Sequence, residues 1–263
     1  MSKHQYIEEA LVLENNPVNH DTLEMVVKSP EIANSAVPGQ FIMVSCANAR
    51  ASPLLRRPIS VHDINGDTFS LLYKVIGTGT KIMSEISPGD HVSMLGPLGQ
   101  GFRVADTQHH CLVGGGIGLA PLLHLAKEIK AKQPESKITI LQGAQNIKDL
   151  LIQDKFKPYG EMQVSTDDGT EGLHGFVTEL LDQVSIADTT VYTCGPEPMM
   201  KAVAAISKKH QWDCQISMET HMACGMGACL GCSYPRAGDH DGVEKYVHVC
   251  KDGPVFDAEV IWA

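Results

Sequence analysis

The first hundred residues alternate short apolar runs with polar turns. Four of these runs are rich in β-branched and aromatic residues, and proline, glycine or asparagine separates them: TLEMVV (22–27), QFIMVSC (40–46), RPISVHDI (57–64) and FSLLYKVI (69–76). Closely spaced short strands of this kind are typical of a small antiparallel barrel. The pattern predicts a β-barrel domain over residues 1–103.

The pattern changes between residues 104 and 213. Strand-like runs occur at 109–115, 137–144, 162–166 and 190–195, and the segments 120–132, 175–183 and 197–209 between them place apolar residues at helical spacing. Strands that alternate with helices predict βαβ units and a parallel sheet. Residues 214–263 lose this periodicity, and we expect them to form a small third module that carries cysteines.

Charge and hydropathy narrow the class of protein. The formal net charge is −10, and no Lys/Arg cluster provides the basic surface that nucleic acids require. The longest apolar run, Cys111 to Ala126, holds four glycines and a proline and is too short to span a bilayer. The opening residues MSKHQYIEEA lack the apolar centre of a signal peptide. We therefore expect no nucleic-acid or membrane partner and a cytoplasmic location.

The cysteine spacing indicates a metal centre. Cys224, Cys229 and Cys232 form C-x4-C-x2-C, and Cys250 follows after seventeen residues. This spacing matches the plant-type [2Fe-2S] pattern. Structural zinc bound by four cysteines is the alternative, although zinc sites usually show two C-x2-C pairs. We expect Gly225, Gly227 and Gly231 to let the loop turn tightly, so that backbone N–H groups reach the sulfurs. The other cysteines (46, 111, 194 and 214) have apolar surroundings and are expected as small core residues.

Two glycine-rich turns follow predicted strands of the α/β region. The first, GGGIGLAPL, runs from Gly114 and reads G-x-G-x-x-P through Gly116, Gly118 and Pro121, which departs from the strict dinucleotide pattern. The second is Cys194-Gly195-Pro196. Ligands of open parallel sheets bind beyond the carboxyl ends of the strands, so the two turns are expected at one crevice that binds a dinucleotide. A tight turn without a ligand is the alternative for the first, and a buried core thiol for Cys194. The segment STDDGTEG (165–172) is a candidate third loop at this edge, although Asp-Gly turns are common without a ligand.

The barrel carries a candidate phosphate contact. Arg57 and Ser60 lie three apart in LRRPISVHD. An arginine fork suits a diphosphate, and a serine hydroxyl suits a flavin nitrogen; an exposed surface arginine is the alternative. The segment YKVIGTGTKIMSEI follows with a glycine turn into a short helix.

Together these motifs resemble the ferredoxin-NADP reductase superfamily over nearly the whole chain. Within it they are most similar to the electron-transfer subunits of dihydroorotate dehydrogenase B, through RRPIS, GTGT, GGGIGLAPL, TDDGTEGLHG, CGPEPMM, MACGMGACLGC and HVCKDGPVF in that order. The resemblance implies an FAD-binding barrel (1–103), an NAD-binding α/β domain (104–213) and a [2Fe-2S] domain (214–263).

The resemblance also implies site residues. The [2Fe-2S] ligands are Cys224, Cys229, Cys232 and Cys250, and the NAD contacts come from the two glycine turns. FAD contacts are implied for Arg57, Pro58, Ile59, Ser60, Tyr73, Lys74, Val75, Gly79 and Thr80. Related reductases place an aromatic residue between the arginine and serine, where this chain has Pro58 and Ile59. No arginine follows the second α/β strand, which favours NAD over NADP.

The resemblance implies an electron path rather than a catalytic side chain. Dihydroorotate is oxidised at FMN on a partner subunit, electrons cross the cluster singly to FAD, and NAD⁺ accepts a hydride, within pyrimidine biosynthesis. The expected assembly is a heterotetramer with two copies of each subunit. A reductase subunit of the NAD(P)H-ferredoxin type or of a sulfhydrogenase is the nearest alternative, and a zinc-stabilised nucleotide-binding regulator is the alternative outside redox chemistry.

Overall fold

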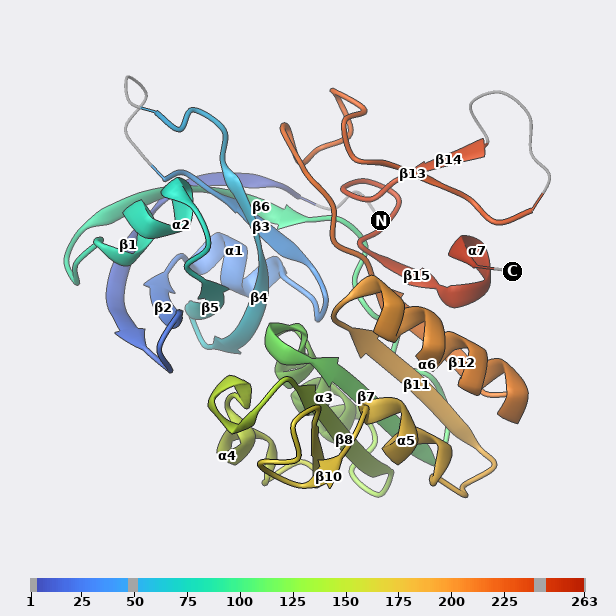
Figure 1. Cartoon of the computed structure of the whole chain (residues 1–263). Coiled ribbons are helices and arrows are strands. Elements are labelled where there is room, and N and C mark those ends of the chain that lie inside the picture. The colour runs from blue at the N-terminus through green and yellow to red at the C-terminus, as the bar shows by residue number, and fades with distance from the viewer. Residues whose placement is uncertain (1–3, 47–51, 239–244, 263) are drawn as a thin grey trace.

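The structure is a computed structural model that describes residues 4–46, 52–238 and 245–262. Within these residues the chain forms a closed six-stranded barrel, a seven-stranded sheet and a two-stranded sheet. Figure 1 shows the barrel in blue to cyan, the larger sheet up to β12 with its helices in green to orange, and the C-terminal segment in orange to red beside both. This architecture confirms the predicted order of barrel, α/β sheet and small C-terminal module.

The barrel strands follow the order β1-β2-β5-β4-β3-β6 and pair with antiparallel neighbours. Along β2 the side chains of Met25 and Val27 are buried and the intervening Val26 is less so, because inward and outward positions alternate in a strand. The inward side chains form one apolar core. The elements are β1 (Tyr6–Pro17), β2 (Thr22–Lys28), α1 (Pro30–Ser35), β3 (Phe41–Val44), β4 (Arg57–Asn65), β5 (Thr68–Lys74), α2 (Thr78–Ser84) and β6 (His91–Leu98).

The larger sheet has the order β10-β9-β8-β7-β11-β12-β15. All neighbours pair in parallel except β15, which is antiparallel to β12. Its elements up to β12 are β7 (His109–Gly115), η1 (Gly116–Leu119), α3 (Leu122–Lys132), β8 (Lys137–Ala144), η2 (Ile147–Asp149), α4 (Gln153–Phe156), β9 (Glu161–Thr166), β10 (Leu173–His174), α5 (Val177–Asp182), β11 (Thr189–Cys194), α6 (Glu197–His210) and β12 (Asp213–Ser217).

Helices cover both faces of this sheet. Leu112 and Ile140 point toward α3 within one core, whereas Val113 and Leu141 point toward α5 and α6 within another. Adjacent residues of one strand thus serve opposite faces, which explains why the strands read as continuous apolar runs. The carboxyl ends of β7 and β11 lead directly into the two glycine turns.

The C-terminal segment contributes β13 (Ser233–Pro235), β14 (Tyr246–His248), β15 (Val255–Asp257) and α7 (Ala258–Ile261). Through β15 it completes the edge of the sheet, and its apolar side chains share a core with β3 and β6 of the barrel. The domain boundaries at 103/104 and 213/214 stay predictions. Among the described residues, no helix combines the length and apolar character that a membrane crossing requires.

Candidate functional site: cysteine loop and two glycine turns

The four predicted ligand cysteines lie together in the C-terminal segment as two pairs. The Sγ atoms of Cys232 and Cys250 are 3.2 Å apart, and both side chains are buried. Cys224 and Cys229 form the other pair, in which the Cys229 side chain is a hydrogen-bond partner of Cys224. Cys229 is exposed, so the loop presents one sulfur at the protein surface and keeps two inside.

Backbone N–H groups point at three of these sulfurs. Gly227 donates to Cys250 Sγ at 3.1 Å, and Cys250 donates to Cys232 Sγ at 3.4 Å. Met226 and Cys229 donate to Cys224 Sγ at 3.5 and 3.4 Å. Burial tends to raise the pKa of Cys224, but these donors outweigh it and lower the pKa to about 6. Burial and the neighbouring Cys232 raise the pKa of Cys250 to about 12. The Cys224 side of the loop is therefore built to stabilise a thiolate.

Two of the three predicted loop glycines are required by the backbone. Gly225 and Gly227 have φ of +73° and +83°, a region that side chains disfavour. A Cβ on Gly225 would meet Met43 Cγ at 2.5 Å, and one on Gly227 would meet Lys251 Cδ at 2.9 Å. Gly231 has neither feature: its Cβ position lies 3.5 Å from Cys229 Sγ, an ordinary contact. The expectation for Gly231 is therefore wrong.

The sulfur arrangement fits a two-iron cluster better than one zinc ion. The two cysteine pairs would supply two thiolates to each of two irons. N–H groups directed at sulfur also suit an anionic cluster whose potential depends on such hydrogen bonds.

The cysteine loop rests on the barrel beside the predicted flavin strand. Gly225 packs on Met43 of β3, and Met43 is fully buried and pairs in register with Pro58 of β4. Cys232 and Cys250 share an apolar core with Met43 and its barrel neighbours. One strand, β3, thus separates the cysteine loop from the segment that carries Arg57 and Ser60.

Among the predicted flavin residues of β4, Arg57 lies against the first turn of α2. Arg57, Pro58, Ile59 and Ser60 are half-buried. The guanidinium of Arg57 lies against Gly79, where a Cβ would come within 2.5 Å of Nε, and its Nη1 donates to the carbonyl of Leu55 at 2.6 Å. Because Gly79 has no side chain, the cationic fork lies directly on the backbone of α2.

The remaining predicted flavin residues have structural partners. The Tyr73 side chain lies in the barrel core, its hydroxyl donates to Asn15 Oδ1 at 2.9 Å, and burial raises its pKa to about 12. Lys74 forms an ion pair with Asp21 at 2.8 Å. Thr80 Oγ1 accepts from the N–H groups of residues 76 and 77 and closes the turn before α2. Val75 packs at the edge of the barrel core. Any contact between Tyr73 and a ligand would therefore come from its backbone.

The two predicted glycine turns touch each other. A Cβ on Gly118 would lie 2.2 Å from the carbonyl oxygen of Cys194, and one on Gly115 would lie 2.8 Å from Pro196 Cδ. Gly114 pairs in register with Cys194. Gly195 has φ of +153°. The structure thus brings both turns to one sheet edge, and only glycine permits their contact.

The other members of these turns are placed as follows. Gly116 has φ of +53° with open space at its Cβ position, and Pro121 immediately precedes α3. Cys194 is partly accessible as a residue, yet burial raises the pKa of its thiol to about 12. Its thiol is thus protonated at neutral pH. Cys46 and Cys111 are buried, as predicted for core residues, and Cys214 is partly buried.

The STDDGTEG segment begins at the end of β9, which lies two strands from β7 in the sheet. Asp168 accepts hydrogen bonds from the N–H and hydroxyl of Thr170 at 3.0 and 2.6 Å. These bonds form a local turn and lower the pKa of Asp168. The Asp168 side chain thus has a structural role within its own loop, as is common for Asp-Gly turns without a ligand.

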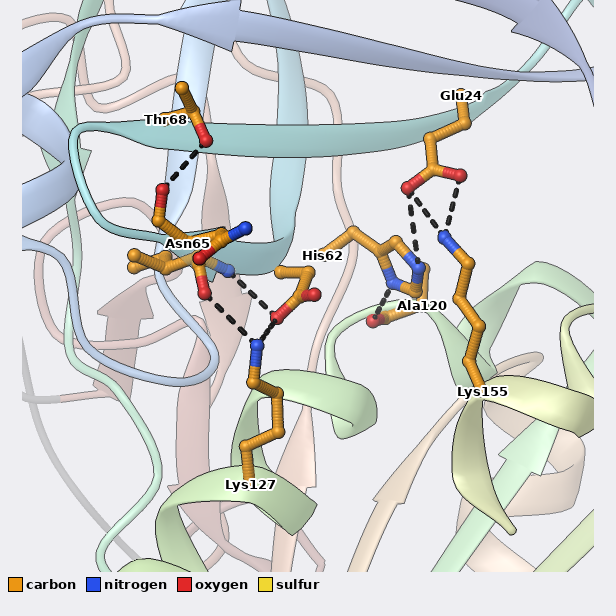
Figure 2. A network of polar contacts seen from close by, with 9 residues as sticks. Glu24, His62, Asn65, Thr68, Ala120, Lys127 and Lys155 are labelled. Carbon is orange, nitrogen blue, oxygen red and sulfur yellow. Dashed lines mark hydrogen bonds and ion pairs between the residues drawn. The ribbon is translucent and has the colours of Figure 1, made fainter. Parts of the chain in front are cut away.

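Polar contacts join the barrel to α3, to α4 and to the turn that precedes α3, and Figure 2 shows them from close by. His62 Nδ1 lies 2.7 Å from the carbonyl oxygen of Ala120. Lys127 Nζ lies 2.5 Å from Asp63 Oδ1, and Lys155 Nζ lies 2.6 Å from Glu24 Oε2. The sequence analysis missed all three contacts, because their partners are 58 to 131 residues apart and share no local pattern.

Two family models match separate segments of the chain. Residues 219–261 match the family model described as the iron-sulfur cluster binding domain of dihydroorotate dehydrogenase B. Residues 112–205 match the oxidoreductase NAD-binding domain. The two matched segments contain the four cysteines and both glycine turns.

Relatives and a solved structure cover nearly the whole chain. The electron transfer subunit of dihydroorotate dehydrogenase B (NAD(+)) from Caldanaerobacter subterraneus is 40% identical over 96% of this chain and 97% of its own length. Its counterpart from Fusobacterium nucleatum is 38% identical over 95% of this chain and 96% of its own length. The structure of an NADH-dependent reduced ferredoxin-NADP oxidoreductase superposes with a TM-score of 0.84 at 26% identity, over 97% of this chain and 90% of that one. With 40% and 38% identity over 96% and 95% of its length, the chain belongs to the family of dihydroorotate dehydrogenase B (NAD⁺) electron transfer subunits.

Proposed function

We propose that this chain passes electrons from a dihydroorotate-oxidising partner subunit, through an iron-sulfur cluster and FAD, to NAD⁺ in pyrimidine biosynthesis. The observation that carries the proposal is the cysteine loop: two sulfur pairs with directed N–H donors lie on the barrel strand next to Arg57–Ser60.

The chain's own residues hold and orient the cofactors. Cys224, Cys229, Cys232 and Cys250 would hold the [2Fe-2S] cluster. Arg57, with the N–H groups of the turn at Gly79, would hold the FAD diphosphate, and Pro58, Ile59 and Ser60 would line the flavin. The turns at Gly114–Pro121 and Cys194–Pro196 would hold NAD.

When bound, FAD supplies the conversion between single-electron transfer and hydride transfer. No side chain of this chain is needed as a general acid or base. Cys194 stays a neutral thiol beside the turn Gly114–Pro121, since its raised pKa keeps the thiol protonated. The loop after β8 carries Lys148 but no arginine at 145–150, which supports NAD rather than NADP.

The partner completes the activity. We propose an FMN-containing catalytic subunit, two copies of each chain in the assembly, and a cytoplasmic location, where free clustered thiols are kept reduced. The exposed Met226 and Leu230 flank the ligand cysteines. They give the surface next to Cys229 the apolar character expected at a subunit contact.

Mixing the subunits tests this function. The isolated chain, loaded with its cofactors, should reduce artificial dyes with NADH but form no NADH from dihydroorotate. Addition of the FMN-containing catalytic subunit should produce NADH, and a mixture with Cys229→Ser should not. Dihydroorotate oxidation by the chain alone, or full activity in a mixture shown to lack the cluster, contradicts the proposed path.

A second function is favoured by one comparison. The TM-score of 0.84 with the NADH-dependent ferredoxin-NADP oxidoreductase suits a chain that exchanges electrons with ferredoxin. The same preparation distinguishes the two: NADH-dependent ferredoxin reduction without any response to the dihydroorotate-oxidising subunit would favour the ferredoxin partner.

A further inference from the structure

We propose that His62 is a positioning residue that ties β4 of the barrel, the strand with the proposed flavin residues, to the glycine turn Gly114–Pro121. Through this contact it sets the affinity for NADH. The inference rests on the proposed function of the turn that ends at Pro121. Among the barrel residues of Figure 2, His62 is the one drawn with a hydrogen bond to this turn.

The position of His62 connects the two cofactor segments. It lies on β4 two residues beyond Ser60, and its Nδ1 is 2.7 Å from the carbonyl oxygen of Ala120. Ala120 follows η1 and precedes Pro121, and its own N–H donates to Ile117 O at 2.9 Å. A shift of β4 is thus transmitted to the turn through one hydrogen bond.

The chemistry of this contact fixes the state of the imidazole. A carbonyl oxygen only accepts, so Nδ1 carries the proton and donates it to Ala120. The side chain is fully buried, and burial lowers its pKa, which keeps the ring neutral. Within the described residues Nε2 has no hydrogen-bond partner. The ring therefore makes a single directed polar contact.

The surroundings preserve that state. Glu24 Oε1 lies 3.9 Å from Nε2, beyond hydrogen-bond distance, and Lys155 binds both oxygens of the same carboxylate at 2.7 and 2.6 Å. Lys155 neutralises the charge that would otherwise draw a second proton onto the ring. The other nearby cation, Lys127, is held by Asp63. Groups of the barrel and of the α/β domain thus together favour the neutral imidazole with its proton on Nδ1.

Two substitutions separate positioning from packing. His62→Asn keeps a donor, because the amide Nδ2 is the same number of bonds from the backbone as Nδ1, but it leaves empty volume. His62→Leu nearly fills the volume and removes the donor. If His62 positions the turn, the leucine variant should be the more damaged; if it only fills space, the asparagine variant should be.

The readouts are amide hydrogen exchange of residues 116–120 without NADH, the dissociation constant for NADH, and the KM and kcat of NADH-dependent dye reduction. In His62→Leu we expect faster exchange and a rise of about tenfold in the dissociation constant and in KM, the size of one lost buried hydrogen bond. His62→Asn should stay within about threefold of the parent. Lys127→Met, which breaks the neighbouring contact to Asp63 without touching the turn, should bind NADH as the parent does.

Gly118→Ala distinguishes failure of this inference from failure of the NAD site. If Gly118→Ala weakens NADH binding and His62→Leu leaves both exchange and affinity unchanged, the positioning role is wrong. If neither variant alters NADH binding, the turn is not the nicotinamide site, and both proposals are overturned. Equal damage in the leucine and asparagine variants, or greater damage in asparagine, assigns His62 to packing and also overturns the inference.

Discussion

Gly118→Ala tests the contact between the two glycine turns most directly. The added Cβ would lie 2.2 Å from the carbonyl oxygen and 2.5 Å from the carbonyl carbon of Cys194, and 2.7 Å from Gly195 Cα. Favourable heavy-atom contacts lie near 3.5 Å, so the turns must separate by about 1 Å. All three contacted atoms belong to the backbone, and no flexible side chain can yield.

The expected loss is large in both stability and rate. Overpacking typically lowers the free energy of unfolding by about 1–3 kcal/mol. Because the contacted atoms are rigid, we expect about 3 kcal/mol here. For a chain of this size that lowers Tm by about 6–12 °C. A 1 Å displacement of a binding turn also costs about 100-fold in rate, so NADH-dependent dye reduction should fall by about that factor in protein with full FAD content.

Gly66→Ala is the matched control. Gly66 lies in the turn between β4 and β5, has φ of +59° and has open space at its Cβ position. Alanine there costs about 1–2 kcal/mol from the left-handed backbone alone, so Tm should fall while the dye reduction rate stays at the parental value. If Gly118→Ala keeps the parental Tm and rate, the turns are not in contact and the reasoning fails.

Three further predictions concern the cluster, the flavin and a buried histidine. Cys229→Ser should abolish or severely reduce the cluster, measured as iron, acid-labile sulfide and the EPR signal of reduced protein; stoichiometric zinc without iron would instead support a zinc site. Arg57→Ala should weaken FAD binding by about 1.5–3 kcal/mol, the value of a charged hydrogen bond, in a flavin titration, with cluster content unchanged; unaltered affinity would remove Arg57 from the site. Burial lowers the pKa of His109 from 6.5 to about 4. Between these pH values the unfolded protein binds a proton at His109 that the folded protein does not bind. Stability that is present above pH 6.5 is therefore lost as pH falls toward 4. Between pH 7.5 and 5.5 the free energy of unfolding should fall by about 1.3 kcal/mol from this group, measured by denaturant titration against His109→Asn, and an identical pH dependence in both proteins would contradict the assignment.

Local sequence patterns predict the features that neighbouring residues determine. The runs at 22–27 and 57–64 alternate or cluster apolar residues over the length of a strand, and β2 and β4 occur there. The turns at Gly118 and Gly195 are visible because a close backbone approach excludes every other residue type. The four cysteines are visible because ligand spacing in a single loop is itself a local property.

Contacts between distant segments leave no such pattern. β15 has only three residues, too few for a periodic signal, and its place beside β12 depends on the fold. Tyr73 lies in a motif associated with flavin, yet its side chain fills the barrel core, because alternation along β5 decides its direction. The His62 contact joins residues 58 apart, and neither has a neighbour that would indicate the other.

The two junctions of the barrel differ in chemistry, and this difference bears on electron transfer. Phe41, Met43 and Leu98 of the barrel share one apolar core with Cys232 and Cys250, so the cluster module is held by close packing that resists displacement. The junction between the barrel and the turn Gly114–Pro121 includes a small apolar cluster of Leu72, Ala120 and Leu151 together with the polar contacts of Figure 2. Single-electron transfer needs a fixed separation between cofactors, whereas NAD must enter and leave. The packed junction suits the first requirement. The polar junction suits the second, because its hydrogen bonds can break and form again.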